Sequence, residues 1–309
     1  MRESVYFVGC GLLLACVEPR DEDASAGLTA SADPSSGAES GSGSDGVDPG
    51  TSAESSDPPK LDVAPGSTEG EDDSDDTTSC DEDVDIVFVM DVSTSMGPFL
   101  NTLADEIMAV DQAIIELGLP NAPHYGLVVF VDDVALLGGG APYADVATLQ
   151  DDFRMWSSFT STNQQVNGGN LNNTWPENSL DALHAAAAGF QWRADALKMV
   201  IHTTDDTFWE GPSTQNGVMI QNDYAGTVDM LQDRTIRVFS FAAQIGGMCE
   251  CEDVTGGWSA PYLGSPPIPE ATDGGVFDID LVLAGQVSLA DAIYGSVETS
   301  MCDPYDPVG

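Results

Sequence analysis

The chain has 309 residues, enough for one α/β domain with additional segments, and its formal net charge is −44. This charge excludes nucleic acids and anionic membrane surfaces as favourable partners. From residue 84 onward only five residues are basic, namely Arg154, Arg193, Lys198, Arg234 and Arg237. A solvated acidic surface explains the excess of acidic residues.

The first residues have the pattern of an export signal. An apolar stretch over residues 5–15 follows a basic start and is too short to span a membrane. It ends in Leu13-Leu14-Ala15-Cys16, which resembles the lipobox of bacterial lipoproteins. The resemblance implies a signal peptide over residues 1–15 and a lipid on the sulfur of Cys16, so that only the lipid enters the membrane. Val17 is not the aspartate of inner-membrane retention, which favours the outer membrane; an ordinary signal peptide is the alternative.

Residues 16–80 predict a disordered linker. The segment is rich in Ser, Gly, Asp and Glu and has almost no large apolar residue, so it cannot bury enough surface to offset its ordering entropy. Its acidic run at residues 71–76 repels itself and extends the chain. That run lacks the glycine turn and the closing glutamate of an EF-hand loop, which argues against calcium binding. We interpret the segment as a tether.

Residues 81–303 alternate between apolar runs and stretches of helical periodicity. The apolar runs predict strands over residues 85–91, 124–131, 196–204, 236–242 and 275–279, with a short antiparallel edge strand over 134–137. The periodic stretches predict helices over residues 98–117, 146–156, 176–190, 218–231 and 288–301, the last capped by Ser288. This alternation indicates an α/β domain with a doubly wound, mostly parallel sheet of Rossmann-like type. A Gly/Pro/Cys-rich insertion occupies residues 244–272, and 304–309 form a tail.

Polar side chains follow two of the predicted strands. The apolar run over residues 86–90 ends at Asp91 and is followed by Ser93 and Ser95, and the strand over 196–204 is followed by Asp205. In open α/β sheets, ligands bind at the carboxyl ends of the strands. Carboxylate and hydroxyl oxygens suit hard divalent cations, so the pattern predicts a site for Mg²⁺, with Ca²⁺ or Mn²⁺ as alternatives.

These motifs resemble the von Willebrand factor A family and its metal-ion-dependent adhesion site (MIDAS). The run from Asp91 to Ser95, Asp-Val-Ser-Thr-Ser, is similar to the family's first motif, and Asp205 to the residue that supplies the last ligand. The resemblance places the middle ligand at Glu177, six residues before Leu183, as in integrin β-subunit domains; Thr174 is the alternative. It implies one divalent cation, with a coordination position left for an acidic residue of a protein partner.

The sequence departs from the integrin β pattern beside the first motif. Gly97-Pro98-Phe99 stands where those domains carry two acidic residues for an adjacent regulatory ion, so that ion is not expected. Asn170, Pro176 and Glu177 match part of a further flanking metal site. Three carboxylates around one cation leave the centre near neutral or negative, so we expect weaker attraction for an anionic ligand than with a threonine in the middle position.

Four of the six cysteines belong to the mature domain: Cys80, Cys249, Cys251 and Cys302. Their even number fits an oxidising compartment, and their spacing is not that of a zinc site. The family resemblance implies a disulfide between Cys80 and Cys302, which leaves Cys249 and Cys251 to pair locally. The two crossed pairings remain open.

No nucleophile elbow, zinc-protease motif or phosphate-binding loop is present in the sequence. The three histidines are isolated from one another in the sequence. The expected function is therefore that of a non-enzymatic, metal-dependent protein-binding or adhesion module on the bacterial envelope. A metal-dependent hydrolase, or a structural module whose cation only stabilises the fold, are the alternatives.

Overall fold

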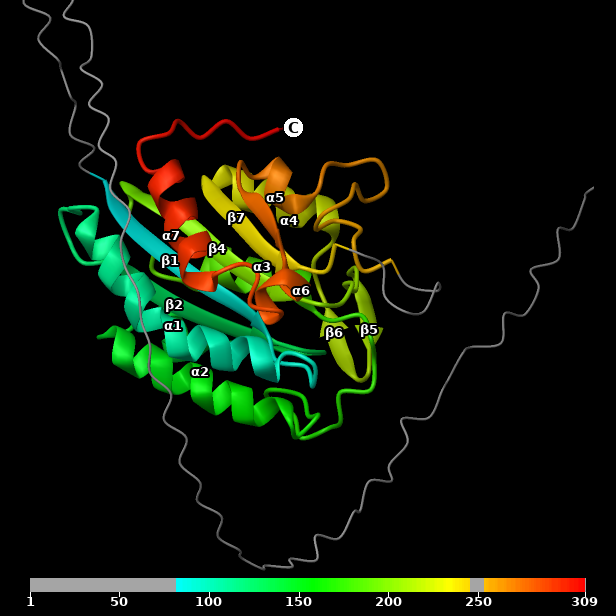
Figure 1. The fold of residues 1–309 in the computed structure, drawn as a ribbon. Helices are drawn as coiled ribbons and strands as arrows, with labels where there is room; N and C mark the ends of the chain where they lie inside the picture. Colours follow the sequence, from blue (N-terminus) through cyan, green and yellow to red (C-terminus); the bar gives the residue numbers. More distant parts are fainter. Residues whose placement is uncertain (1–81, 245–252, 309) are drawn as a thin grey trace, which may run out of the picture. The chain divides into compact units, whose positions relative to one another are not determined.

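The computed structural model describes residues 82–244 and 253–308 (Figure 1). Our predictions for the signal peptide, for lipidation at Cys16, for the linker and for Cys80, Cys249 and Cys251 lie outside these residues. The described chain forms one mostly parallel sheet with helices on both faces, as expected. Among these residues, no helix combines the length and apolarity that a membrane crossing requires.

Six strands form the main sheet in the order β3-β2-β1-β4-β7-β8. Their bounds are Asp83–Asp91 (β1), His124–Phe130 (β2), Val134–Leu136 (β3), Ala196–Thr204 (β4), Ile236–Ala242 (β7) and Gly275–Asp278 (β8). All neighbours are parallel except β2 and β3. The chain builds outward from β1 to β3 and then continues on the other side of β1 with β4, so the direction of winding reverses between β1 and β4.

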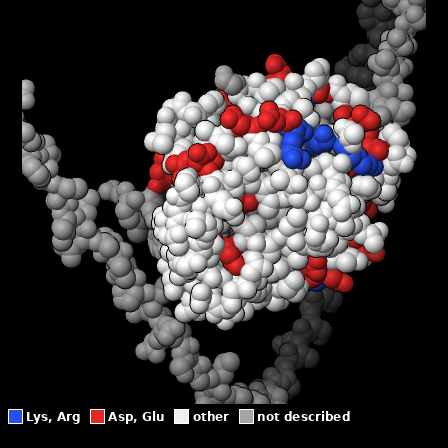
Figure 2. Space-filling model, turned by 180° about the vertical axis from the view of Figure 1, so that it is seen from behind, with Lys and Arg blue, Asp and Glu red and all other residues white. Residues whose placement is uncertain are grey.

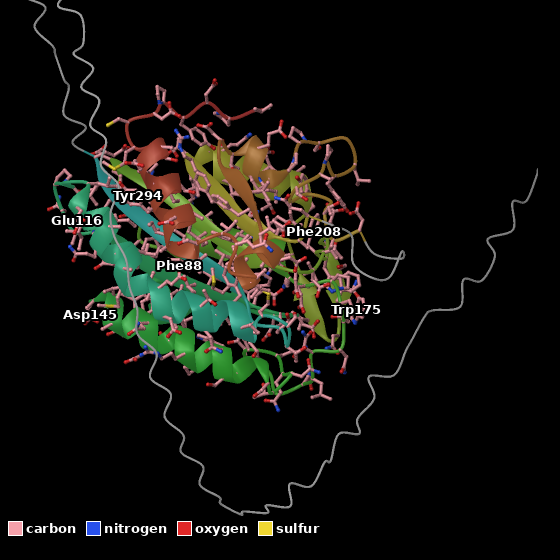
Figure 3. All side chains as sticks on the ribbon, in the orientation of Figure 1. Phe88, Glu116, Asp145, Trp175, Phe208 and Tyr294 are labelled. Carbon is pink, nitrogen blue, oxygen red and sulfur yellow. The ribbon has the colours of Figure 1, made fainter. Side chains whose placement is uncertain are left out.

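The central strands are apolar on both faces because both faces are covered. Along β1, Ile86 and Phe88 enter one core while Val87 and Val89 enter the other, and all four are fully buried. Phe88 is labelled in Figure 3. It packs edge-to-face against Phe153, with ring centroids 5.2 Å apart. Such burial contributes about 1.5–3 kcal/mol for a side chain of this size.

Helices cover both faces of the sheet (Figure 1). Among the described residues, four helices contribute to the core on the first face and three to the core on the second. The first set is Gly97–Glu116 (α1), Val146–Thr160 (α2), Ile279–Leu283 (α6) and Leu289–Ser300 (α7); the second is Ser179–Gly189 (α3), Tyr224–Asp233 (α4) and Ile268–Ala271 (α5). The predicted cap of the last helix is confirmed, because Ser288 Oγ accepts a hydrogen bond from Asp291 N at 3.1 Å.

Two predicted helices begin later than expected. The helix predicted from residue 176 begins at Ser179, because the backbone amides of Glu177 and Asn178 bond to the carbonyls of Thr207 and Val131 instead. The helix predicted from residue 218 begins at Tyr224, after a hairpin of Ser213–Gln215 (β5) and Val218–Ile220 (β6).

The β5–β6 hairpin closes through Asn216 and Gly217, whose φ angles are 45° and 80°. An Asn-Gly pair with positive φ at both positions is the preferred two-residue hairpin turn. The apolar residues of β6 also suit a helix, so periodicity alone misassigned them.

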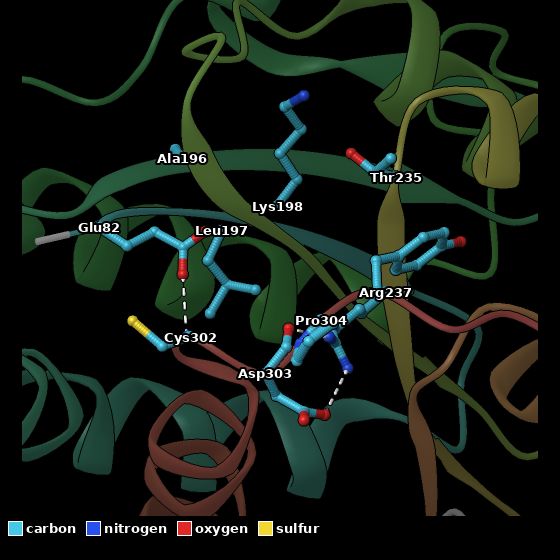
Figure 4. Close-up of a pocket in the computed structure, with 10 residues that line it drawn as sticks. Glu82, Ala196, Leu197, Lys198, Thr235, Arg237, Cys302, Asp303 and Pro304 are labelled. Atoms are coloured by element: carbon cyan, nitrogen blue, oxygen red, sulfur yellow. Dashed lines mark hydrogen bonds and ion pairs between the residues drawn. The ribbon is translucent and has the colours of Figure 1, made fainter. Parts of the chain in front are cut away.

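The two ends of the described domain meet at the amino end of the sheet. Cys302 N donates a hydrogen bond to a Glu82 carboxylate oxygen at 3.1 Å, beside a hollow of about 300 Å³ (Figure 4). Lys198 Nζ donates to the carbonyl of Arg234 at 3.5 Å at this end. Figure 2 shows the Lys and Arg side chains of one face gathered in a patch with acidic side chains beside them. The contact between Glu82 and Cys302 places the two ends of the described domain next to each other, and the Cys80–Cys302 disulfide stays a prediction.

The second core contains a fully buried histidine. The ring of His202 lies between Phe130 and Trp258, with centroids 5.9 Å and 4.2 Å away, and its Nδ1 is 3.1 Å from Ser240 Oγ. Burial lowers the pKa of His202 to about 3. The folded protein therefore holds a neutral imidazole over a pH range in which the unfolded chain takes up a proton.

This histidine predicts acid sensitivity of the fold. As pH falls from about 6.5 toward 3, His202 takes up a proton in the unfolded chain before it does so in the folded protein. This difference lowers the free energy of unfolding by up to about 1.4 kcal/mol per pH unit. His202→Phe keeps an aromatic ring in the stack and removes the titration. We expect its free energy of unfolding, measured by denaturant titration at several pH values, to fall less steeply below pH 6.5 than that of the wild type. Parallel curves for the two proteins would contradict the assignment.

Candidate metal centre

The candidate site lies where the winding of the sheet reverses. Asp91 ends β1 and Asp205 follows β4, and these two strands are adjacent and parallel. Loops that leave two such strands in opposite directions open a crevice at the carboxyl edge of the sheet. The fold therefore brings together two carboxylates that are more than one hundred residues apart in sequence.

Hydrogen bonds connect the first motif to the second. Asp91 is fully buried; one carboxylate oxygen accepts from Ser93 N at 2.7 Å and the other from Thr204 Oγ1 at 2.8 Å. Ser93 Oγ lies 3.2 Å from Ser95 Oγ, and Ser95 Oγ donates to Asp205 at 3.0 Å. The four predicted residues Asp91, Ser93, Ser95 and Asp205 thus form one connected set of oxygen atoms.

Glu177 approaches this set from the loop before α3. Backbone hydrogen bonds with Thr207 and Trp209 attach it to the loop after β4, and its side chain is 1% exposed. One carboxylate oxygen accepts from Asn172 Nδ2 at 2.9 Å. The other, Oε2, is buried and has no hydrogen-bond partner among the described residues.

Thr174, the alternative middle ligand, faces a different carboxylate. Its hydroxyl donates a hydrogen bond to Asp132, which follows β2 and is fully buried. Asp132 also accepts from Asn216 in the turn of the β5–β6 hairpin. Thr174 is therefore engaged with Asp132, whereas Glu177 is close enough to Asp91 for the two charges to interact.

The flanking metal site that Asn170, Pro176 and Glu177 match in part stays a prediction. Asn172 contacts the Glu177 carboxylate, and the carbonyl of Asn170 accepts from Gln165 N at 2.9 Å. Asn172 lies in the two-residue expansion that the sequence carries before Pro176.

The carboxylates of the centre are electrostatically unfavourable to one another. Burial, with the nearby charge of Asp205, raises the pKa of Asp91 to about 7. Burial and the charge of Asp91 raise the pKa of Glu177 well above its usual range, and burial raises that of Asp205. A divalent cation would replace this mutual repulsion with attraction.

The donor set fits a hard cation. Carboxylate and hydroxyl oxygens are the ligands of Mg²⁺ and Ca²⁺, and the buried Oε2 of Glu177 lacks the partner that a buried carboxylate oxygen requires. Within residues 82–244 and 253–308, no three Asp, Glu, His or Cys side chains converge closely enough to hold an ion by themselves. The first turn of α1 carries no acidic residue, in agreement with the sequence.

Sequence reasoning missed three residues that shape this edge: Asp132, Asn172 and Asn216. Asp132 directly follows the strand predicted over residues 124–131, and a carboxylate at the end of a strand was the signal that identified Asp91 and Asp205. Asn216 bonds Asp132 and also donates to the carbonyl of Leu171 at 2.7 Å, which attaches the hairpin to the loop before α3. No local pattern reveals that contact.

The structure is an α/β fold, and the loops at the carboxyl edge of its sheet carry the residues whose motifs resemble the von Willebrand factor A family in the sequence. No protein-family model and no curated protein matches the sequence. Among solved structures, the chain is similar to proximal thread matrix protein 1 from the mussel byssus with a zinc-occupied MIDAS motif, at 14% identity and a TM-score of 0.40. That similarity covers 69% of this chain and 48% of the mussel protein, so the chain spans about half of that protein's length.

A second similar structure is the conserved hypothetical protein BatB from Bacteroides thetaiotaomicron. The identity is 15% and the TM-score 0.39, over 71% of this chain and 100% of that chain. Similarities at these levels carry no argument about the ligands of this chain.

Two substitutions test which residue is the middle ligand. We expect Glu177→Gln to weaken Mg²⁺ binding at least about tenfold, because it removes a charged oxygen from the centre. Thr174→Val should leave the affinity close to that of the wild type. Isothermal titration calorimetry measures the Mg²⁺ affinity of both variants, and the reverse order of affinities would assign the middle ligand to Thr174.

A melting experiment in EDTA is the control for folding. Glu177→Gln should unfold at or above the wild-type temperature, since it removes a buried carboxylate that faces Asp91. This result would show that Glu177→Gln weakens Mg²⁺ binding without destabilising the fold.

Proposed function

We propose that this domain binds a protein partner through a divalent cation at the carboxyl edge of β1 and β4. The connected oxygen set from Asp91 to Asp205, with the unpartnered Oε2 of Glu177 beside it, is the observation that carries the proposal. Asp91, Ser93, Ser95, Glu177 and Asp205 are the residues that would hold the ion, and Mg²⁺ is the first choice. The bound ion would supply a Lewis-acidic position that an acidic side chain of the partner completes.

The location we propose is the bacterial envelope. Its support is the sequence: an export signal, Cys16 at a lipobox-like cleavage point, and a linker over residues 16–80 that would hold the domain away from the membrane. The outer membrane is favoured over the inner membrane.

Two other functions use the same cation. A hydrolase would need a general base or a nucleophile beside the ion, and the hydroxyls of Ser93 and Ser95 are engaged with each other and with Asp205. A purely structural ion would stabilise the fold without capturing a partner. The experiments below separate both from the proposed function.

Removal of Asp91 tests the metal centre directly. We expect Mg²⁺ to raise the melting temperature of the wild type and to leave that of Asp91→Ala unchanged; saturation at one hundred times Kd corresponds to about 2.7 kcal/mol. Asp151→Ala is the matched control, since its carboxylate is 78% exposed and pairs with Arg154 on the exposed surface of α2. An equal response to Mg²⁺ in all three proteins would place the ion elsewhere.

Capture from the native envelope then tests partner binding. A partner should be retained by the wild type and by Asp151→Ala in Mg²⁺, and released by EDTA or by Asp91→Ala. A melting shift without any Mg²⁺-dependent partner would favour the structural alternative. Activity on a hydrolase substrate panel that disappears in Asp91→Ala would favour the enzyme.

Glu177 also sets the charge of the centre. With three carboxylates around a divalent cation the net charge is at most neutral, so an incoming carboxylate gains little attraction. Glu177→Thr removes one negative charge and should increase the affinity for a partner or peptide that presents an acidic side chain, measured by titration in Mg²⁺. Unchanged or weaker affinity would show that the charge of Glu177 does not control the ligand.

A further inference from the structure

A second cavity lies beside the candidate metal centre, between β3, α3 and the β5–β6 hairpin. Its volume is about 590 Å³, which accommodates a long side chain with its neighbouring backbone. Apolar side chains line it from three elements: Val134 and Leu136 of β3, Ala185 and Ala188 of α3, and Val218 and Met219 of β6. None of the described residues that line it is Lys or Arg.

Two carboxylates stand in the polar part of the cavity, and the backbone fixes both. Asp133 accepts from the backbone amides of Val166 and Asn167, each at 2.7 Å. Asp181 accepts from Asn222 N at 2.9 Å and from Asn222 Nδ2 at 2.8 Å. These donors are neutral, so they hold the carboxylates in place without cancelling their charge.

Asn178 gives an independent indication of a ligand. It lines the cavity, is 1% exposed, and donates from Nδ2 to Asp181 at 3.2 Å. This bond fixes the orientation of the amide, because the opposite orientation would place its oxygen against a carboxylate. The remaining Oδ1 is a buried acceptor with no hydrogen-bond partner among the described residues. A buried acceptor without a donor costs about 1–3 kcal/mol, so a donor from a ligand would be favourable there.

His184 carries a second buried polar atom without a hydrogen-bond partner among the described residues. The ring lines the cavity and is hydrogen-bonded to the backbone of Gly226, whereas its Nε2 is buried and has no partner in the described part of the chain. A ring that donates to a backbone carbonyl through Nδ1 presents an acceptor at Nε2. Asn178 and His184 thus each contribute a buried acceptor without a donor among the described residues.

We propose that this cavity binds an arginine side chain presented by the partner polypeptide. The apolar walls suit the aliphatic stem, and Asp133 and Asp181 attract the charge. A guanidinium carries five donors in one plane, which suits several fixed acceptors better than a single ammonium group. Asn178 directly follows Glu177, so one loop supplies residues to both the cavity and the metal centre. The proposal rests on the proposed function for the partner that presents the arginine, but binding in the cavity does not depend on a bound ion.

A blocked tripeptide, acetyl-Ala-Arg-Ala-amide, is the probe. It is titrated in Mg²⁺ buffer against the full chain with methyl-labelled alanine, so that Ala185 and Ala188 report on the cavity. The neutral analogue with citrulline in place of arginine has the same shape and lacks the charge. We expect saturable shifts of both alanine methyls with the arginine peptide, and on the order of tenfold weaker binding with citrulline.

Met219→Lys places a competing cation among the residues that line the cavity, on a side chain that is 60% exposed. It should weaken the arginine peptide on the order of tenfold, whereas Met219→Leu should bind as the wild type does. Met108→Lys, at a 45% exposed position of α1, controls for the general charge of the protein and should have little effect.

Asp91→Ala distinguishes the cavity from the metal centre. Peptide binding that survives this substitution supports the cavity whether or not the proposed metal function holds. The proposal is overturned if citrulline binds as well as arginine, if Met108→Lys weakens binding as much as Met219→Lys, or if Asp91→Ala abolishes the shifts at Ala185 and Ala188.

Discussion

Mutual repulsion between buried carboxylates is the constraint on which the rest of this structure depends. Asp91, Glu177 and Asp205 reach one edge of the sheet from three loops, and their burial raises the pKa of each. Nothing in the apolar cores favours this arrangement, so backbone and hydroxyl hydrogen bonds must hold it in place. The loops after β1 and β4 and the loop before α3 are shaped by that requirement.

The sheet could be predicted from the sequence because its signal is local. Strands such as Ala196–Thr204 are apolar on both faces, and this pattern is a property of consecutive residues. The same reasoning placed Asp91 and Asp205 at strand ends, since a polar residue after an apolar run marks the edge of the sheet. Parallel pairing then brought the two together.

The remaining features could not be predicted because they depend on contacts between distant segments. Glu177 precedes α3 instead of lying within it, since its amide bonds to the loop after β4. The hairpin turn at Asn216 reaches Asp132, more than eighty residues earlier in the chain. Local periodicity contains no information about either contact, which is why a helix was expected over the residues of β6.

Trp258 has a consequence for the mechanical behaviour of the metal centre. This indole comes from the chain after β7, is fully buried against His202, and donates to the carbonyl of Asp206 at 3.3 Å. The loop that carries Asp205 therefore contacts a large aromatic side chain on the side that faces the core. That loop cannot shift without opening a void in the core, so the spacing of the oxygen atoms is set by aromatic packing beneath them. Trp258, which belongs to the insertion after β7, thereby helps to position the residues of the site.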